Sequence, residues 1–426
     1  MNPYTDPTVR LTLAVPPPGH PTSRPAPPPG RRLPAPAVHP MTAMPPGPRP
    51  GPRRPVPAPA AAPRPPAPAG EPGHPPPSAP PPRGGDERPG GRGRRLALLA
   101  GGSALVAVLA VVALLLTGVI RTGPSAPPVL SAGPLPTERV TPYADMSTAT
   151  PPDLAAYVRD TGQRDVVLAF VLAGPDGCDR PAWGGTVPVG DPKVTERVAA
   201  LRAAGGSVAV ATGGARAPYL ETACTDAESL ARAYRTALDV VGSNHLDVDL
   251  EAAVDSDLVA DALAALQRER GTAITLTLPV AGRESALTAA GLEILRAVAD
   301  RGVAVRTNTM AMNFPHTGDW RGAVLGSMDA AARQLGEVWP TADPAELRRR
   351  LGVTVMIGRN DQGMVTTPED AAAVVDRARA LGLGSVGLWS VTRDVGSCPT
   401  AVEARPDCSG VAQGRYAYTG VLQGFA

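Results

Sequence analysis

Short apolar runs alternate with longer segments of helical spacing through the last two thirds of the chain. The runs lie at residues 140–146, 166–172, 207–212, 246–250, 273–278, 303–312, 353–357 and 385–389. Each has the length and the β-branched content of a buried strand. Because more than a dozen residues separate neighbouring runs, we expect parallel strands joined by helices. Eight such units predict an α/β fold, a closed (β/α)₈ TIM barrel at residues 140–426.

Capping residues indicate where the connecting helices begin. A Thr or Asp precedes a proline in four dipeptides, which is typical of the first turn of a helix. They are Thr150-Pro151, Asp191-Pro192, Asp343-Pro344 and Thr367-Pro368. A fifth start, Thr225-Asp226-Ala227-Glu228, has capping-box spacing.

One predicted strand differs from the others because acidic residues alternate with its apolar residues. Residues 246–251 read Leu-Asp-Val-Asp-Leu-Glu. Since successive side chains of a strand point to opposite faces, Asp247, Asp249 and Glu251 share one face. Like charges at this spacing raise one another's proton affinity, an arrangement that acid catalysis often uses. We expect Glu251 to be the last residue of the fourth strand, at the end of the barrel where active sites lie.

Composition divides the chain into two parts of different charge. The first 95 residues contain 33 of the 53 prolines and carry a formal charge of +9, whereas the whole chain carries +2. This part lacks a periodic apolar pattern, so we expect residues 1–95 to form a disordered Pro- and Arg-rich arm. One alternative is that this arm is the functional part of the chain and recruits partner proteins through its proline-rich segments.

Residues 96–120 are 25 consecutive residues without a charged side chain. A helix of this length extends roughly 37 Å, more than the ~30 Å hydrocarbon core of a bilayer. Several arginines precede the run and only Arg121 follows it closely, which places the amino end in the cytoplasm. We therefore predict a single-pass protein of the cell membrane that contacts lipid through residues 96–120. The barrel is then extracellular, and residues 121–139 are a linker.

All four cysteines fall in the part of the chain that follows this run. Their distribution fits an oxidising compartment. The sequence allows three pairings, and we expect Cys178 to pair with Cys224 and Cys398 with Cys408. The absence of a Cys-x-x-Cys pair, with only two histidines in this part, argues against a zinc site.

The acidic strand resembles the Asp-x-Asp-x-Glu signature of glycoside hydrolase family 18, the chitinases. Further segments resemble other motifs of the family and follow the same order. They are Pro142-Tyr143-Ala144-Asp145, Gly213-Gly214, Met310-Ala311-Met312, Met356-Ile357-Gly358-Arg359-Asn360-Asp361 and Leu388-Trp389-Ser390-Val391-Thr392-Arg393-Asp394. Together they extend the resemblance over roughly residues 140–426.

The resemblance implies a glycosidase that cleaves β-1,4 bonds next to N-acetylglucosamine by a substrate-assisted, retaining mechanism. Glu251 would be the general acid and then the base. Asp249 would hydrogen-bond the acetamide nitrogen, and Asp247 would share a proton behind it. The implied partner is chitin or another N-acetylglucosamine-containing glycan such as peptidoglycan.

The same resemblance implies a sugar-binding surface. Trp389 would form the floor under the reacting sugar, because a flat ring packs against the apolar face of a pyranose. The other implied substrate-binding residues are Tyr143, Met310, Met312 and Asn313. We expect a monomer that binds no nucleic acid and needs neither a metal nor another cofactor.

Two positions depart from the family pattern. Ala211 stands where the family usually has Ser, which removes a hydrogen-bond donor to Asp247. Asn313-Phe314 replaces a usual Asp-Tyr pair, which removes a carboxylate and a hydroxyl. A chitinase-like lectin that binds glycans without cleaving them is therefore an alternative. A calcium or magnesium site at the three acids is another.

Overall fold

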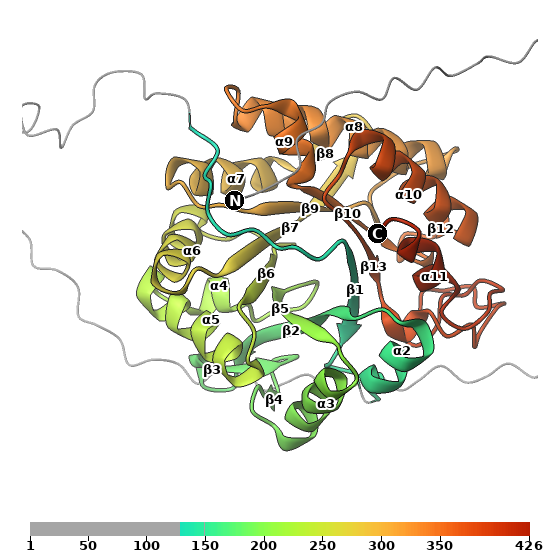
Figure 1. Cartoon of the computed structure of the whole chain (residues 1–426), viewed down its shortest axis with the longest axis horizontal. Coiled ribbons are helices and arrows are strands. Elements are labelled where there is room, and N and C mark those ends of the chain that lie inside the picture. Colours follow the sequence, from blue (N-terminus) through green and yellow to red (C-terminus); the bar gives the residue numbers. More distant parts are fainter. Residues whose placement is uncertain (1–127, 149) are drawn as a thin grey trace, which may run out of the picture. The chain divides into compact units, whose positions relative to one another are not determined.

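The computed structural model describes residues 128–148 and 150–426, and the predicted (β/α)₈ barrel is confirmed there. Eight parallel strands close into a ring in the order β1-β2-β5-β6-β7-β9-β10-β13, because β1 pairs with both β2 and β13 (Figure 1). They are β1 (Val140–Asp145), β2 (Asp165–Gly174), β5 (Ser207–Gly213), β6 (His245–Asp249), β7 (Ala273–Gly282), β9 (Arg306–Met310), β10 (Leu351–Met356) and β13 (Ser385–Trp389). Each coincides with one of the eight apolar runs of the sequence.

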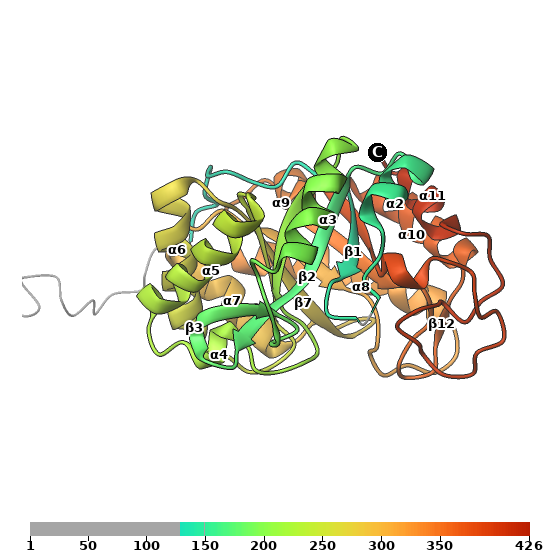
Figure 2. The ribbon, with the colours of Figure 1, turned by 90° about the horizontal axis from the view of Figure 1, so that it is seen from below.

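Helices surround the strands and form the outer layer (Figures 1 and 2). They are α2 (Leu154–Thr161), α3 (Pro192–Ala203), α4 (Leu220–Ala223), α5 (Ala227–Val241), α6 (Ser256–Arg270), α7 (Ala289–Asp300), α8 (Trp320–Val338), α9 (Pro344–Arg349), α10 (Pro368–Leu381) and α11 (Ala417–Gln423), with a 3-10 turn η1 (Val391–Arg393). Short strands extend the loops that follow the barrel strands. They are β3 (Gly177–Trp183), β4 (Val187–Pro188), β8 (Ala286–Leu287), β11 (Gly358–Arg359) and β12 (Val365–Thr366).

Three of the five predicted helix starts are confirmed by their caps. The side chains of Asp191, Asp343 and Thr367 each accept a hydrogen bond from a backbone N–H of the first turn. The other two predictions are wrong by one to three residues. Helix α2 is capped by Asp153 rather than by Thr150, and α5 by Asp226, which forms its capping box with Ser229. In both cases an aspartate nearer the first turn supplies the acceptor oxygen.

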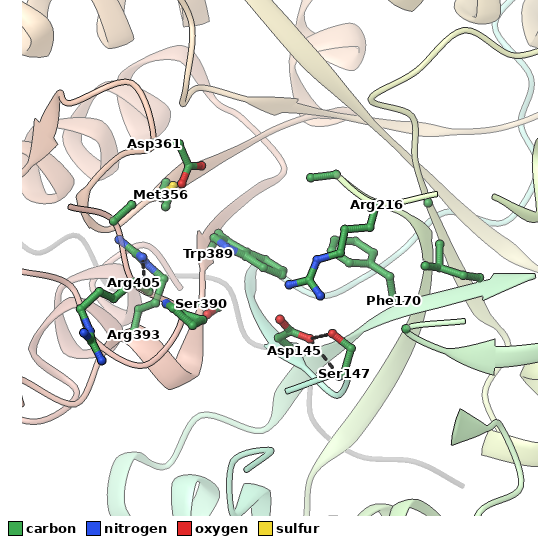
Figure 3. Close-up of a pocket in the computed structure, with 16 residues that line it drawn as sticks. Asp145, Ser147, Phe170, Arg216, Met356, Asp361, Trp389, Ser390, Arg393 and Arg405 are labelled. Atoms are coloured by element: carbon green, nitrogen blue, oxygen red, sulfur yellow. Dashed lines mark hydrogen bonds between the residues drawn. The ribbon is translucent and has the colours of Figure 1, made fainter. Parts of the chain in front are cut away.

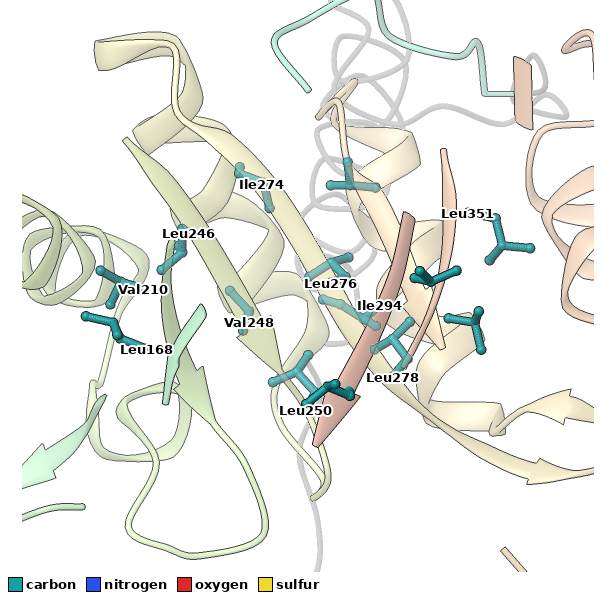
Figure 4. Packing of buried hydrophobic residues seen from close by; sticks show 14 of the residues in the cluster. Leu168, Val210, Leu246, Val248, Leu250, Ile274, Leu276, Leu278, Ile294 and Leu351 are labelled. Carbon is teal, nitrogen blue, oxygen red and sulfur yellow. The ribbon is translucent and has the colours of Figure 1, made fainter. Parts of the chain in front are cut away.

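The apolar core lies mainly between the sheet and its helices. Leu246, Val248 and Leu250 point outward from β6 and its end into this layer, as the alternation predicts (Figure 4). The barrel interior holds a smaller cluster of Tyr143, Val167, Ala169, Ala209 and Ala211. Small side chains on this inner face leave room for the buried acids of β6.

The segment before β1 crosses the end of the barrel where the strands begin (Figures 1 and 2). Arg306 holds it by donating hydrogen bonds of 2.7 Å to the carbonyls of Glu138 and Pro136. The Glu138 carboxylate in turn lies 3.1 Å from Nδ1 of His245. Burial raises the pKa of Glu138, but the hydrogen bond and charge of His245 outweigh it and lower the pKa to about 2. The described part of the predicted linker, residues 128–139, thus lies against the barrel, and it is called the strap below.

Replacing Glu138 with Gln is expected to lower the free energy of unfolding by about 1–3 kcal/mol, since His245 and the strap lose a charged partner. The pKa of folded Glu138 is depressed, so its contribution is present above its ordinary value of 4.5 and is lost as the pH falls towards 2. Urea unfolding at pH 6 measures the change. E228Q is the control, because Glu228 pairs with Arg232 on the exposed surface. Equal losses in both variants would contradict a role for the strap.

Both predicted disulfides are confirmed. Cys178 of β3 is bonded to Cys224 after α4, with Cα atoms 4.9 Å apart, and Cys398 to Cys408 across a loop, with Cα atoms 5.9 Å apart. The first bond ties β3 to the residue that follows α4. The second closes the base of the loop between η1 and α11.

The predicted arm, residues 1–95, and the predicted membrane span, residues 96–120, lie outside the described residues. Within residues 128–148 and 150–426, no helix is long and apolar enough to cross a membrane. Membrane attachment stays a prediction from the sequence.

Candidate active site

The three acids lie at the end of the barrel opposite the strap. Asp247 and Asp249 point inward from β6 and are buried, with 1% and 3% of their surface exposed. The expectation that Glu251 ends the strand is wrong, because β6 ends at Asp249. Leu250, the next residue, still pairs with β7, because its backbone N–H donates a hydrogen bond of 3.0 Å to the carbonyl oxygen of Thr277. Glu251 therefore stands two residues beyond the strand, in the mouth of the cleft.

Asp247 is held by two hydroxyl groups from other strands. Tyr143 on β1 donates to Oδ2 at 2.5 Å, and Thr277 on β7 donates to Oδ1 at 2.7 Å. Ala211 on β5 is paired with Asp247 in the sheet, where its methyl group offers no hydrogen bond. Both oxygens of Asp247 are thus satisfied without a serine at position 211. Burial raises the pKa of Asp247, although these hydrogen bonds oppose the shift.

Asn308 on β9 supports the two hydroxyl donors. Its amide nitrogen lies 3.1 Å from the oxygens of both Tyr143 and Thr277, and 2.9 Å from that of Thr354 on β10. The Tyr143 oxygen accepts a hydrogen bond from the Asn308 amide, so its own phenol proton is free to point at Asp247. Four strands besides β6 therefore contribute to one buried network that fixes the position of the first acid.

Asp249 is the acid with a free oxygen. Its Oδ1 is buried and has no hydrogen-bond partner among the described residues, and the side chain lines the cleft. Burial and the charges of Glu251 and Asp247 raise its pKa well above the ordinary value. The neighbouring strand approaches very closely here, because a Cβ on Gly213 would lie 1.8 Å from the Asp249 carbonyl oxygen. Gly213, with φ of +81°, is the residue that permits this approach.

The Glu251 side chain is exposed to solvent in the cleft, and the residues that line the cleft lie around it. Loss of surrounding water, together with the charge of Asp361, raises the pKa of Glu251 to about 7. No hydrogen bond from the described residues contributes to this shift. The side chain can therefore be protonated near neutral pH and can reach a ligand in the cleft.

Asp361 supplies the charge that residue 313 lacks. The Asn313 amide donates to Asp361 Oδ2 at 2.7 Å, and the Asp361 backbone N–H donates to Asn313 Oδ1 at 2.9 Å. This reciprocal pair fixes a carboxylate near Glu251. Asn313 carries no charge itself, and the neighbouring Asp361 provides the charge that acts on Glu251.

The remaining predicted sugar-binding residues come together around these acids. Tyr143, Met310, Met312, Asn313 and Trp389 all line one cavity of about 230 Å³ with Asp249 and Glu251. Trp389 stacks on Phe170 with ring centroids 5.3 Å apart and planes inclined by 21° (Figure 3). The pair forms an aromatic surface on one side of the cleft. Their roles in binding remain predictions.

Sequence reasoning missed several residues of the site. Phe170, Thr277 and Asn308 lie inside strands that read as ordinary apolar or mixed segments. Asp361 ends a motif that the resemblance did single out, but no role was assigned to it. Tyr219 follows Pro218 in a loop, and burial with the nearby charges of Glu251 and Asp249 raises its pKa to about 12. Only the fold brings these five residues to the same end of the barrel.

Within the part of the chain that the structure describes, no cluster of His, Cys, Asp and Glu has the arrangement of a metal site. Both carboxylate oxygens of Asp247 accept hydrogen bonds from hydroxyl groups, so this residue is poorly suited to bind a metal ion.

Replacing Asp361 with Asn is expected to move the alkaline fall in activity to lower pH. The Asp361 charge raises the pKa of Glu251, so its removal lets Glu251 ionise earlier. A shift of about one pH unit is the usual minimum for one close charge. The profile of kcat/KM between pH 5 and 9 measures the effect. Asp376→Asn, at an exposed carboxylate near Arg379 on α10, is the control, and an unchanged profile in D361N would contradict the assignment.

Solved structures similar to this one identify the barrel. The catalytic domain of a hyperthermophilic chitinase from Pyrococcus furiosus is 34% identical, covers 69% of this chain with 97% of its own length, and superimposes with a TM-score of 0.63. The active domain 2 of the thermostable chitinase from the same organism, solved with chito-oligosaccharides, has the same identity and TM-score over 96% of its length. The chain belongs to the chitinases of glycoside hydrolase family 18.

More distant relatives are also named as chitinases. A probable bifunctional chitinase/lysozyme of Escherichia coli is 28% identical over 309 residues, and an endochitinase of Metarhizium anisopliae is 28% identical over 283 residues. The chain spans only 34% and 53% of their respective lengths. No family model matches the sequence.

Proposed function

We propose that this chitinase hydrolyses β-1,4 bonds on the reducing side of N-acetylglucosamine residues by a substrate-assisted, retaining mechanism. The observation that carries the proposal is the contrast between Glu251 and Asp249. Glu251 titrates near pH 7 in the open cleft, whereas Asp249 is buried with a pKa raised well above the ordinary value. Glu251 is thus available as a proton donor, and Asp249 is poorly suited to act as an ionised nucleophile.

Protonated Glu251 donates its proton to the glycosidic oxygen as the bond to the anomeric carbon breaks. The carbonyl oxygen of the substrate's own 2-acetamido group attacks that carbon and forms an oxazolinium ring. Glu251, now ionised, then removes a proton from water. The water oxygen attacks the anomeric carbon from the face that the leaving group vacated while the bond to the acetamide oxygen breaks, which regenerates the acetamide group and retains the configuration.

Asp249 directs the acetamide group in this scheme. Its Oδ1 is buried, faces the cleft and has no hydrogen-bond partner among the described residues, so it can accept from the acetamide N–H. The positive charge that develops on the ring favours the ionised form of Asp249. Asp247 lies behind it, held by Tyr143 and Thr277, and can share the displaced proton.

Trp389 supports the sugar in the reacting position. Its ring is half-buried, and its stacking on Phe170 holds one orientation. A pyranose has an apolar face that packs on such a surface. We propose chitin or another N-acetylglucosamine-containing glycan, including peptidoglycan, as the polymer.

Incubation of the purified chain with N-acetylglucosamine hexamer and with peptide-free peptidoglycan strands tests the proposal. New reducing ends are expected from at least one of these substrates. Calorimetry on the same samples measures binding separately. Binding without release of reducing ends would favour the lectin alternative, and neither binding nor release would overturn both.

Membrane attachment through residues 96–120, with the amino end in the cytoplasm, is part of the same proposal. The strap enters the barrel at the end opposite the acids. An enzyme attached in this way would present its cleft away from the point where the strap joins the barrel.

A further inference from the structure

A second cavity extends the cleft beyond the acids. It has a volume of about 280 Å³ and shares Phe170, Ala215, Met356, Asp361 and Trp389 with the cavity that contains Glu251. The two cavities therefore form one groove with the aromatic pair between them. A glycan chain that places one sugar over Trp389 places a neighbouring sugar in the second cavity.

Arginines stand out among the residues that line this second cavity. Arg393 is buried, with 1% of its surface exposed, and donates to the carbonyls of Ile357, Arg359 and Arg405. Its role is to hold the loop that carries Arg405. The Arg405 guanidinium forms two hydrogen bonds, of 3.0 and 3.1 Å, with the carboxylate of Asp407. Arg393 thus uses its terminal nitrogens on these carbonyls, its buried Nε has no partner among the described residues, and Arg405 is ion-paired with Asp407.

Arg216 differs from both. It lies in the loop between β5 and α4, is exposed to solvent, and reaches over Phe170 towards Trp389 and Asp145 (Figure 3). Among residues 128–148 and 150–426, no carboxylate oxygen lies within 4.0 Å of its guanidinium. A guanidinium presents a planar set of donors that matches a carboxylate.

The acids of the second cavity are already engaged elsewhere. Asp145 Oδ1 accepts from the backbone N–H and the hydroxyl of Ser147, at 2.9 and 2.6 Å. Asp361 is paired with the amide of Asn313. The raised pKa values of Asp247, Asp249 and Glu251 also reduce the negative charge that an anionic ligand meets near neutral pH. Asp145 and Asp361 keep their charges, so a negative group on a ligand is favoured only where it reaches the guanidinium of Arg216.

We propose that Arg216 binds a carboxylate on the sugar in the second cavity, so that the groove selects an acidic N-acetylglucosamine-containing glycan over a neutral one. The inference rests on the proposed function, because it assigns specificity to the same cleft. A lactyl ether on the sugar and a uronic acid both supply a carboxylate of this kind. The experiment below separates these two sources.

Binding and hydrolysis are measured with three oligosaccharides of equal length. One is neutral N-acetylglucosamine hexamer, one alternates with sugars that carry a lactyl ether, and one contains uronic acid. Each acidic oligosaccharide is also tested with its carboxylates converted to amides. Binding is measured on an E251Q background, which gives a readout independent of turnover.

Arg216→Gln is expected to weaken binding of the preferred acidic oligosaccharide by about ten- to hundredfold, the usual range for one charge-assisted hydrogen bond. The loss should appear in KM rather than in kcat, and should shrink at high salt. Amidation of the ligand should remove the difference between R216Q and the parent. Arg333→Gln on α8, also exposed and outside the cleft, is the control.

The outcomes distinguish the two proposals. Hydrolysis of the neutral hexamer, with equal affinity for acidic, amidated and neutral ligands, would overturn the role of Arg216 and leave the proposed function intact. Selective, Arg216-dependent binding of an acidic ligand without hydrolysis of any oligosaccharide would support the Arg216 site and overturn the proposed reaction. The acidic ligand that R216Q affects identifies the source of the carboxylate.

Discussion

Replacing Glu251 with Gln is expected to reduce hydrolysis of N-acetylglucosamine oligomers by roughly a thousandfold or more. Gln has nearly the shape of Glu but carries no ionisable proton, so neither the acid step nor the base step can occur. No hydrogen bond from the described residues contributes to the pKa shift of Glu251, so the substitution should leave the fold unchanged. Release of reducing ends under single-turnover conditions measures the loss.

The matched control is Glu293→Gln, at an exposed position on α7 away from the cleft. It should retain full activity. E251Q should still bind the oligomer with an affinity near that of the parent. Residual hydrolysis above about a tenth of the parent rate would mean that another group donates the proton, and the assignment would fail.

Replacing Asp249 with Asn is expected to lower kcat by about a hundred- to a thousandfold, the usual cost of removing one group that stabilises charge in the transition state. Asn can still accept a hydrogen bond from the acetamide N–H, so KM should change little. It cannot become negative as the oxazolinium ring forms. The loss should therefore lie in kcat.

Asp257→Asn, at an exposed residue of α6, is the control for this substitution. A D249N variant that loses affinity while keeping its kcat would assign Asp249 to ground-state binding instead. A substrate with a thioamide in place of the acetamide gives an independent check. If Asp249 acts directly on the acetamide group, D249N should change the rate of the thioamide substrate by a different factor from that of the parent substrate, and equal factors would mean that the two act independently.

The barrel and the acidic strand could be predicted from the sequence because both depend on local periodicity. Apolar runs of strand length recur eight times, and the alternation from residue 246 to 251 places the acids on the inner face. The pairing of the cysteines was confirmed as well. Errors occurred where two local signals compete, as at Thr150 and Asp153, and the nearer acceptor formed the cap.

The hydrogen bonds that hold the acids could not be predicted, because they join residues from strands that are distant in the sequence. Tyr143 and Thr277 donate to Asp247 from β1 and β7, and Asn308 on β9 supports both donors, so Asp247 is held without a serine at position 211. Asp361 lies 48 residues from Asn313, and only the folded chain joins them. The missing serine and the missing carboxylate are thus compensated by side chains that lie far away in the sequence.

The configuration of the first product tests the central claim most directly. Proton NMR of N-acetylglucosamine hexamer, recorded within the first minutes of digestion, distinguishes the α and β forms of the new reducing end before they interconvert. Attack by the acetamide oxygen followed by water predicts the β form. Initial appearance of the α form would contradict the mechanism, and an unchanged hexamer spectrum would contradict hydrolysis of this substrate.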